Sequence, residues 1–311
     1  MIIDMPDTTT NAVSKRLDSL RDEGGAVALG RVLTLVVVAI EADIEAAVVA
    51  ANEASHEHPC RVVVVAPGAP HATSGRLDAQ IRVGGDAGAS EVVVLRCAEP
   101  LQDHTDTLVM PLLLPDAPIV VWWPTGGPDA PVEDPLGAMA QRRITDTTKA
   151  ADPVAMLARL ASAFTEGDTD LAWARVTLWR GLIAAAVDQP PYEPVTSVRV
   201  EGEAQHTSLD LLAAWLGLKL RCPATVVRTD GSDAITRVVL ERKSGEIVLD
   251  RPDGRVVTIT EPGKPARHMA LPIRSLSEAL IEELRRLDPD EIYGQVLGKG
   301  LGRIATVEAS A

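Results

Sequence analysis

The residues with the clearest capacity for chemistry lie in one stretch, 168–191, DTDLAWARVTLWRGLIAAAVDQPP. It holds two of the five tryptophans of the chain, Trp173 and Trp179, together with Arg175 and Arg180. A guanidinium in a dry environment needs a carboxylate or a phosphate, because a lone buried charge is very costly. Tryptophan and arginine are also the side chains most enriched at binding hot spots. These four residues therefore predict either a structural cluster with internal carboxylate partners or a partner- or anion-binding site.

A helix must position these four side chains. Thr169 or Asp170 can cap its start, and Pro190-Pro191 ends it because proline lacks an amide N–H. Apolar residues lie nearly all round the helical projection, which is typical of a buried helix. We therefore expect one central buried helix, over 166–192, that joins two domains.

A second group of candidate side chains, His56, His58 and Cys60, alternates in the segment HEHPC. Metal ligands must converge on one ion, whereas Pro59 and a strand expected to begin at Cys60 keep these side chains apart. The sequence also contains no P-loop and no G-x-S-x-G nucleophile elbow. We therefore expect no catalytic residue, no metal and no cofactor.

Buried strands with a helix between them are predicted in the first half of the chain. The runs 32–40 and 61–66 are rich in valine and do not alternate, which is typical of strands buried on both faces. A helix between them predicts a right-handed parallel unit. Ligands of such sheets bind at the carboxyl ends of the strands, and Trp122 and Trp123 end the strand predicted at 119–123. These two tryptophans either fill the core and cover a loop or form a binding lip.

The second half of the chain has a different pattern. Turns at 230–231, 244–245 and 253–254 separate β-branched runs and predict hairpins. The predicted fold class is α/β, with a mainly parallel sheet in an N-terminal domain that the central helix joins to a smaller α+β C-terminal domain. The expected boundaries are 1–165 for the α/β domain, 166–192 for the connecting helix, 193–298 for the α+β domain with antiparallel strands, and 299–311 for a tail.

Composition limits the classes of partner. The formal net charge is −14 and no basic stripe is present, which argues against nucleic acid. The first ten residues lack the pattern of a signal peptide, and the longest apolar run, 32–40, is far shorter than the about 20 residues that a membrane span needs. The three cysteines, Cys60, Cys97 and Cys222, are dispersed and form no disulfide framework. We expect a cytoplasmic protein without a membrane partner.

Five segments, in the same order along nearly the whole chain, resemble the glucose-6-phosphate dehydrogenase assembly protein family, also called OpcA. They are HEHPCRVVVV at 56–65, the strand and double tryptophan at 119–123, RRITD at 142–146, DTDLAWARVTLWR at 168–180 and LRRLDPDEIY at 284–293. The resemblance implies a non-enzymatic partner of the first dehydrogenase of the oxidative pentose phosphate pathway. Such a protein aids the oligomeric assembly of glucose-6-phosphate dehydrogenase and raises its activity.

The resemblance carries over to individual positions of this sequence. The matching residues are Trp173, Arg175, Trp179 and Arg180, with His58, Pro59 and Arg61. Cys60 stands where a small hydroxyl residue is expected, and the chain has no C-x-x-C motif, so a redox switch is not expected. Two alternatives remain beside the activator. One is a sensor or enzyme that binds a sugar phosphate through Arg175 or Arg180; the other is a scaffold that holds other pentose phosphate enzymes together.

Overall fold

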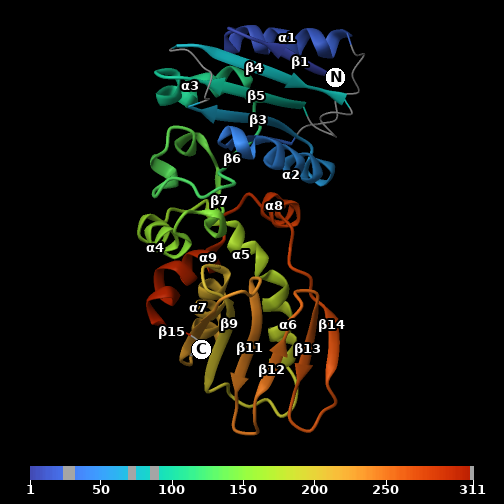
Figure 1. Cartoon of the computed structure of the whole chain (residues 1–311), viewed down its shortest axis with the longest axis vertical. Helices are drawn as coiled ribbons and strands as arrows, with labels where there is room; N and C mark the ends of the chain where they lie inside the picture. The colour runs from blue at the N-terminus through green and yellow to red at the C-terminus, as the bar shows by residue number, and fades with distance from the viewer. Residues whose placement is uncertain (24–31, 69–74, 85–90, 309–311) are drawn as a thin grey trace. The chain divides into compact units, whose positions relative to one another are not determined.

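The computed structural model describes residues 1–23, 32–68, 75–84 and 91–308, which form two compact units (Figure 1). The first unit contains Met1–Asp146, Gly167–Thr169 and Leu276–Pro289, and the second contains Thr147–Glu166, Asp170–Ser275 and the chain from Asp290 onward. The chain therefore passes between the units several times. The expected boundaries, which assigned one continuous segment to each domain, differ from these limits.

The first unit is built on an eight-stranded sheet with the order β1-β4-β5-β3-β2-β6-β7-β8. The pairs β5–β3, β3–β2, β2–β6 and β6–β7 are parallel, whereas β4 pairs antiparallel with both β1 and β5. The sheet is thus mixed, which agrees with the α/β class. The strands are β1 (Ile2–Met5), β2 (Leu33–Val38), β3 (Cys60–Pro67), β4 (Leu77–Arg82), β5 (Glu91–Cys97), β6 (Ile119–Trp122), β7 (Arg142–Thr145) and β8 (Asp168–Asp170).

The valine-rich runs behave as the sequence predicts. Val62 to Val65 in β3 are completely buried, and β2 and β3 are parallel with the helix α2 (Ile44–Glu57) between them in the chain. Parallel strands with both faces covered need apolar residues at every position, not at every second one. The helix α1 (Thr10–Glu23) shares a hydrophobic cluster with alternate residues of these strands, while α2 packs against α8 (Leu276–Leu284).

The second unit contains a seven-stranded sheet with the order β14-β13-β12-β11-β9-β10-β15. Turns at 244–245 and 253–254 close antiparallel hairpins, as predicted. The hairpin predicted at 230–231 is wrong, because β9 lies between β10 and β11 and pairs parallel with β10. The strands are β9 (Ser197–Glu203), β10 (Ala224–Thr229), β11 (Ile235–Glu241), β12 (Ile247–Asp250), β13 (Val256–Thr260), β14 (Arg267–Ala270) and β15 (Ile304–Glu308).

The end of the chain is part of this sheet. We expected a tail over 299–311, but β15 pairs parallel with β10 from Ile304 to Glu308. Its short, moderately apolar sequence carries little signal of its own, because the pairing depends on a strand far away in the sequence. Residues 309–311 of the predicted tail lie outside the described residues.

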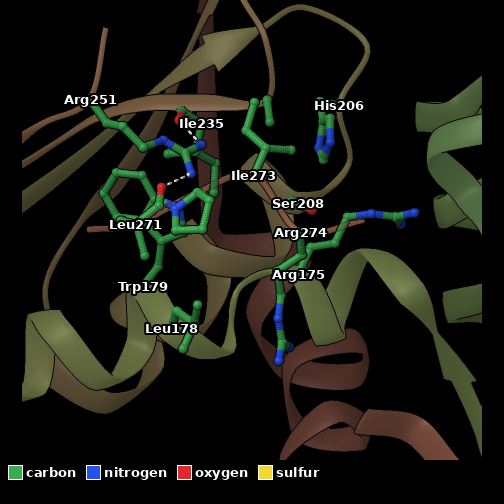
Figure 2. Close-up of a pocket in the computed structure, with 12 residues that line it drawn as sticks. Arg175, Leu178, Trp179, His206, Ser208, Ile235, Arg251, Leu271, Ile273 and Arg274 are labelled. Atoms are coloured by element: carbon green, nitrogen blue, oxygen red, sulfur yellow. Dashed lines mark hydrogen bonds between the residues drawn. The ribbon is translucent and has the colours of Figure 1, made fainter. Parts of the chain in front are cut away.

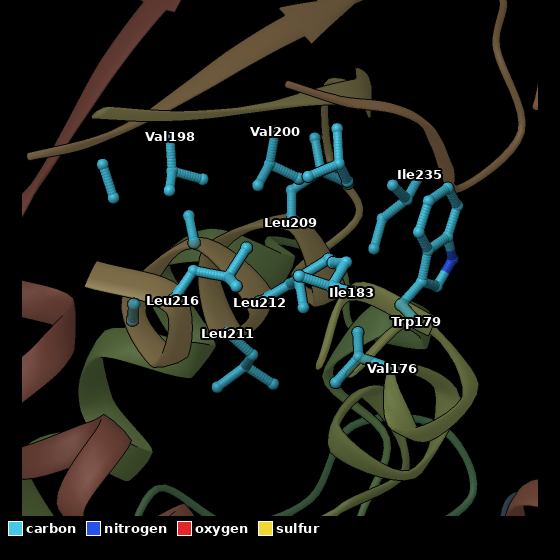
Figure 3. Packing of buried hydrophobic residues seen from close by; sticks show 14 of the residues in the cluster. Val176, Trp179, Ile183, Val198, Val200, Leu209, Leu211, Leu212, Leu216 and Ile235 are labelled. Carbon is cyan, nitrogen blue, oxygen red and sulfur yellow. The ribbon is translucent and has the colours of Figure 1, made fainter. Parts of the chain in front are cut away.

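The core of the second unit lies between its sheet and several helices. Figure 3 shows α6 (Thr177–Val187) and α7 (Ser208–Leu220) presenting Trp179, Ile183, Leu209 and Leu212 to the strand residues Val198, Val200 and Ile235. The remaining helices of this unit are α4 (Pro153–Ala163), α5 (Leu171–Arg175) and α9 (Glu291–Gln295). In the described parts of the chain, no helix is both long and apolar enough to cross a membrane.

The single central helix predicted over 166–192 is wrong. It is replaced by α5 and α6, which Val176 separates with backbone angles φ −93° and ψ 0°. A tertiary contact supports the break, since Arg274 donates to the carbonyl of Ala174 at 2.9 Å and satisfies the end of α5. Sequence periodicity cannot reveal a contact with a residue 100 positions away.

Complete burial of this segment is also wrong. In α6 the buried residues are Trp179, Ile183 and Ala186, whereas Leu178 is 42% exposed and Ala184 and Ala185 are exposed. The predicted stripe through Leu178 therefore faces solvent in part. Both helices belong to the second unit and share its core, so they do not form a separate connecting element.

A buried ion pair stabilises the first unit where α8 meets the sheet. Arg142 of β7 lies 2.7 Å from the carboxylate of Glu283 of α8, which also accepts a hydrogen bond from Thr169 at 2.9 Å. Both charged side chains are almost completely buried. Burial raises the pKa of Glu283 although Arg142 acts in the opposite direction. The pair fixes the segment Leu276–Pro289 on the first unit.

We predict that Glu283→Ala lowers the free energy of unfolding by about 3–5 kcal/mol, because it leaves Arg142 buried without its carboxylate. Urea denaturation monitored by circular dichroism measures this loss. Arg286→Ala, at an exposed position just after α8, is the matched control and should change the free energy by less than about 0.5 kcal/mol. Equal effects of the two substitutions would contradict the role assigned to the pair.

Candidate functional site

Trp173 lies near the start of the stretch 168–191 that the sequence singled out. It is 1% exposed, and its indole N–H donates to Oδ2 of Asp290 at 2.8 Å. Oδ1 of the same carboxylate accepts from the amides of Ile292 and Tyr293 at 2.9 Å and caps α9. The ring of Tyr293 lies 5.8 Å from the ring of Trp173. Trp173 thereby joins α5 to α9.

Arg180 covers the ring of Trp173. Its guanidinium carbon lies 3.8 Å from the ring centroid, and its Nη2 donates to Oγ1 of Thr177 at 2.8 Å. A second indole, that of Trp215 in α7, lies 6.0 Å from the same guanidinium. Desolvated cation–π contacts of this kind stabilise a folded structure by about 2 kcal/mol. Arg180 is thus part of the packing of the second unit.

Trp179 has a similar arginine neighbour. The guanidinium of Arg251 lies 5.0 Å from its ring centroid and donates to the backbone carbonyl of Leu271 at 3.0 Å and to that of Ile235. Arg251 is 3% exposed, and these two hydrogen bonds go to backbone carbonyls and not to a carboxylate. Burial lowers the pKa of Arg251 to about 10. Carbonyl dipoles and an aromatic face therefore take the place of the carboxylate that we expected beside a buried arginine.

A cleft opens beside Trp179, but it is very small. Its volume is about 20 Å³, which is room for roughly one water molecule. Small-molecule sites usually measure about 300–1,000 Å³. Figure 2 shows that Arg175 and Arg274, which also line the cleft, extend away from the guanidinium of Arg251. The arginines therefore do not converge, and the cleft has no room for a sugar phosphate held by Arg175.

The tryptophans at the end of β6 do not form an exposed lip. Trp122 is completely buried and Trp123 is 6% exposed, and Trp123 belongs to the hydrophobic cluster of the first unit. An added Cβ on Gly127 would lie 2.9 Å from Thr145 and 3.3 Å from Trp123, so the loop after β6 packs closely on this ring. Of the two interpretations, the structure places both residues in the core.

His58 and Arg61 lie in different environments and do not form one site. Arg61 is 5% exposed, donates from Nε to Glu91 at 3.0 Å and from Nη1 to the carbonyl of Leu112 at 2.8 Å, and so serves the first unit as a buried ion pair. His58 is half-buried at the end of α2. His56 is exposed and Cys60 is buried at the start of β3, and the described residues include no group of three candidate metal ligands.

We call Trp173 and the three residues around it, Arg180, Asp290 and Tyr293, the Trp173 cluster. Asp290 and Tyr293 were not among the candidate residues. Both lie in the segment 284–293, which the sequence already linked to the family, but the sequence did not predict that they contact Trp173. Asp170 caps α5 through the amide of Ala172 at 2.8 Å and also accepts from the amide and hydroxyl of Thr147 at 2.9 Å. Asp168 forms a buried ion pair with Arg143, so Asp168 and Asp170 both have structural partners.

Comparison with known proteins covers both halves of the chain. The family profile described as "Glucose-6-phosphate dehydrogenase subunit N-terminal domain" matches residues 51–162, and the profile for the C-terminal domain of the same subunit matches residues 166–297. The chain belongs to the OpcA family. The Trp173 cluster and the Arg61–Glu91 pair therefore lie within the regions by which this family is defined.

Two cyanobacterial relatives carry the same family name. The OxPP cycle protein OpcA of Synechococcus elongatus is 30% identical over 151 residues, 46% of this chain and 34% of the relative. Its namesake in Nostoc punctiforme is 24% identical over 203 residues, 60% of this chain and 44% of the relative. The matched region is thus less than half the length of each relative.

Solved structures give only distant likenesses. A 3-ketoreductase from Actinomadura kijaniata aligns over 89% of this chain and 99% of its own with 10% identity and a TM-score of 0.42. The WlbA dehydrogenase from Bordetella pertussis aligns over 86% of this chain and 93% of its own, with 14% identity and a TM-score of 0.40. Likenesses this distant carry no conclusion about the activity of this chain.

We predict that Arg180→Ala lowers the free energy of unfolding by about 2 kcal/mol, because the indole of Trp173 loses the cation that covers it. Chemical denaturation monitored by tryptophan fluorescence measures the change. Leu178→Ala, two positions away and partly exposed, should cost less than about 1 kcal/mol. Unchanged stability of Arg180→Ala together with loss of partner binding would instead make Arg180 a contact residue.

Proposed function

We propose that this protein is a non-catalytic assembly factor that binds glucose-6-phosphate dehydrogenase directly and favours its active oligomer. Membership of the OpcA family over both halves of the chain is the observation that carries this proposal. The family profiles name a subunit of that dehydrogenase, and the cyanobacterial relatives are named for the oxidative pentose phosphate cycle. A role as a protein partner fits both descriptions.

The geometry of the Trp173 cluster supports binding over catalysis. Arg180 of α6 lies over the ring of Trp173 of α5, and Trp179 shares their core. The cleft beside Trp179 measures about 20 Å³. A catalytic site needs a concave pocket in which an acid, base or nucleophile reaches the substrate. The stretch that marks the family instead shapes the second unit, so the dehydrogenase would meet surfaces that this cluster holds in place.

Activation by an assembly factor requires differential binding. A partner that binds the active and inactive oligomers equally well shifts no equilibrium, however tight the complex. A tenfold shift towards the active oligomer requires about 1.4 kcal/mol of preference for it. A few well-packed contacts between the two proteins are enough to supply this preference. Catalytic groups from this chain are not needed.

A sugar-phosphate sensor or enzyme is the second candidate function. The cleft beside Arg175 argues against the position that we first expected for such a site, because the space is too small. A larger cavity elsewhere in the second unit has room for such a ligand.

We predict that this protein raises the activity of the cognate glucose-6-phosphate dehydrogenase when the enzyme is diluted until its oligomer dissociates. NADPH absorbance measures the activity, and size-exclusion chromatography with light scattering measures the mass of the complex. The expected result is higher activity together with co-elution in a larger species, since binding the oligomer draws the equilibrium towards it.

An unrelated acidic protein at the same concentration controls for protection of the dilute enzyme from surfaces. Activation by both proteins to the same extent would remove the evidence for specific binding. If the cognate enzyme gains no activity and forms no complex, the proposal is wrong.

A further inference from the structure

A second cavity in the second unit is large enough for a metabolite. Its volume is about 690 Å³, within the range of about 300–1,000 Å³ that is usual for small-molecule sites. It lies at the end of α7 and the beginnings of β10 and β15. Its apolar or small lining residues are Ala214, Gly217, Leu218, Pro223, Ala224, Gly300 and Ile304, with Cys222 beside them.

The charged side chains of this cavity are all positive. Arg221, after α7, and Arg303, before β15, are its only charged lining residues, and both are exposed. Within the described part of the chain, neither has a carboxylate within ion-pair distance. The chain as a whole has a net charge of −14, so a concave surface with two cations and no acidic residue is a local reversal of its charge. Such a surface attracts anions.

The backbone of Arg221 is unusual for an arginine. Its φ is +56°, in the left-handed region, where it ends α7. Glycine is the residue that most often takes this position, because it has no Cβ to clash there. An arginine at this position introduces a cation where the fold alone favours glycine.

The wall of the cavity is built on closely packed elements. A Cβ added to Gly300 would lie 3.0 Å from the Cβ of Ala214, and a Cβ added to Gly217 would lie 3.2 Å from the Cβ of Ala224. Glycine at these two positions lets α7 approach both the segment around Gly300 and β10. The apolar wall is therefore held by regular structure, which suits a preformed binding site.

We propose that this cavity binds a phosphate monoester of a small metabolite. Arg221 and Arg303 would contact the phosphate, because guanidinium groups present paired N–H donors that match phosphate oxygens. Leu218, Pro223 and Ile304 would contact an apolar face of the organic part. This site differs from the Trp173 cluster and does not depend on binding to the dehydrogenase.

Calorimetry with the full chain tests the site directly. The probes are glucose 6-phosphate and adenosine 5′-monophosphate, each compared with its unphosphorylated form, glucose or adenosine. At least one phosphorylated probe should bind, and its unphosphorylated form should not. Arg221→Gly and Arg303→Gln should each weaken this binding by roughly tenfold.

The variants separate binding from folding. Arg221→Gly removes the cation and relieves the left-handed backbone, so the variant should be at least as stable as the parent protein. Arg286→Gln removes a cation from an exposed position outside the cavity and serves as the control for net charge. Its affinity for the probe should equal that of the parent protein.

Cys222 reports where the probe binds. It is the half-buried cysteine of this cavity, whereas Cys60 and Cys97 are buried. Burial raises the pKa of the Cys222 thiol, so alkylation should be followed at mildly alkaline pH, where more thiolate forms. A probe in the cavity should slow the alkylation of Cys222, as measured by mass spectrometry of the digested protein.

Two results would overturn the proposal. One is the absence of binding by both phosphorylated probes at millimolar concentration. The other is binding that Arg221→Gly and Arg303→Gln leave unchanged, or that does not slow alkylation of Cys222. Either result would leave the cavity without a role in binding phosphate esters, whatever the dehydrogenase assay shows.

Discussion

The packing of the second unit depends on the contacts that the indole of Trp173 makes in the core. Its N–H needs an acceptor and its ring needs close neighbours, and the fold supplies Asp290 at 2.8 Å, the ring of Tyr293 and the guanidinium of Arg180 at 3.8 Å. These partners come from α6 and from α9 with its N-cap residue Asp290. One side chain thereby fixes elements that lie more than 100 residues apart in the sequence.

This arrangement gives the stretch 168–180, which resembles the family, a structural role. Tryptophan and arginine together suggest a binding hot spot, and the same residue types also make a cation–π core. Arg180 lies over Trp173 and Arg251 lies beside Trp179, so each of these two buried indoles has a cation as a neighbour. We therefore assign residues 170–180 of this stretch to the packing of the second unit. The surfaces that would contact a partner or a ligand lie outside this stretch.

Local sequence patterns predicted the parts of the fold that local physics decides. Val62 to Val65 form a fully buried parallel strand, and the turns at 244–245 and 253–254 close antiparallel hairpins. The break at Val176 was not predictable, because it is supported by Arg274 from a distant loop. That α8 belongs to the first unit was not predictable either, because its place depends on the ion pair between Arg142 and Glu283, which are far apart in the sequence. At the candidate site the sequence identified Trp173 and Arg180 but not whether they face a ligand or each other.

Hydrogen exchange of the amides in α5 and α6, measured with and without glucose-6-phosphate dehydrogenase, tests this assignment most directly. If the Trp173 cluster is part of the core, the amides from Leu171 to Arg175 exchange slowly in the isolated protein, because core elements open only with large-scale unfolding. We predict that the dehydrogenase leaves their exchange unchanged. Fast exchange in the isolated protein, with protection appearing only in the complex, would contradict it and make this stretch the docking surface.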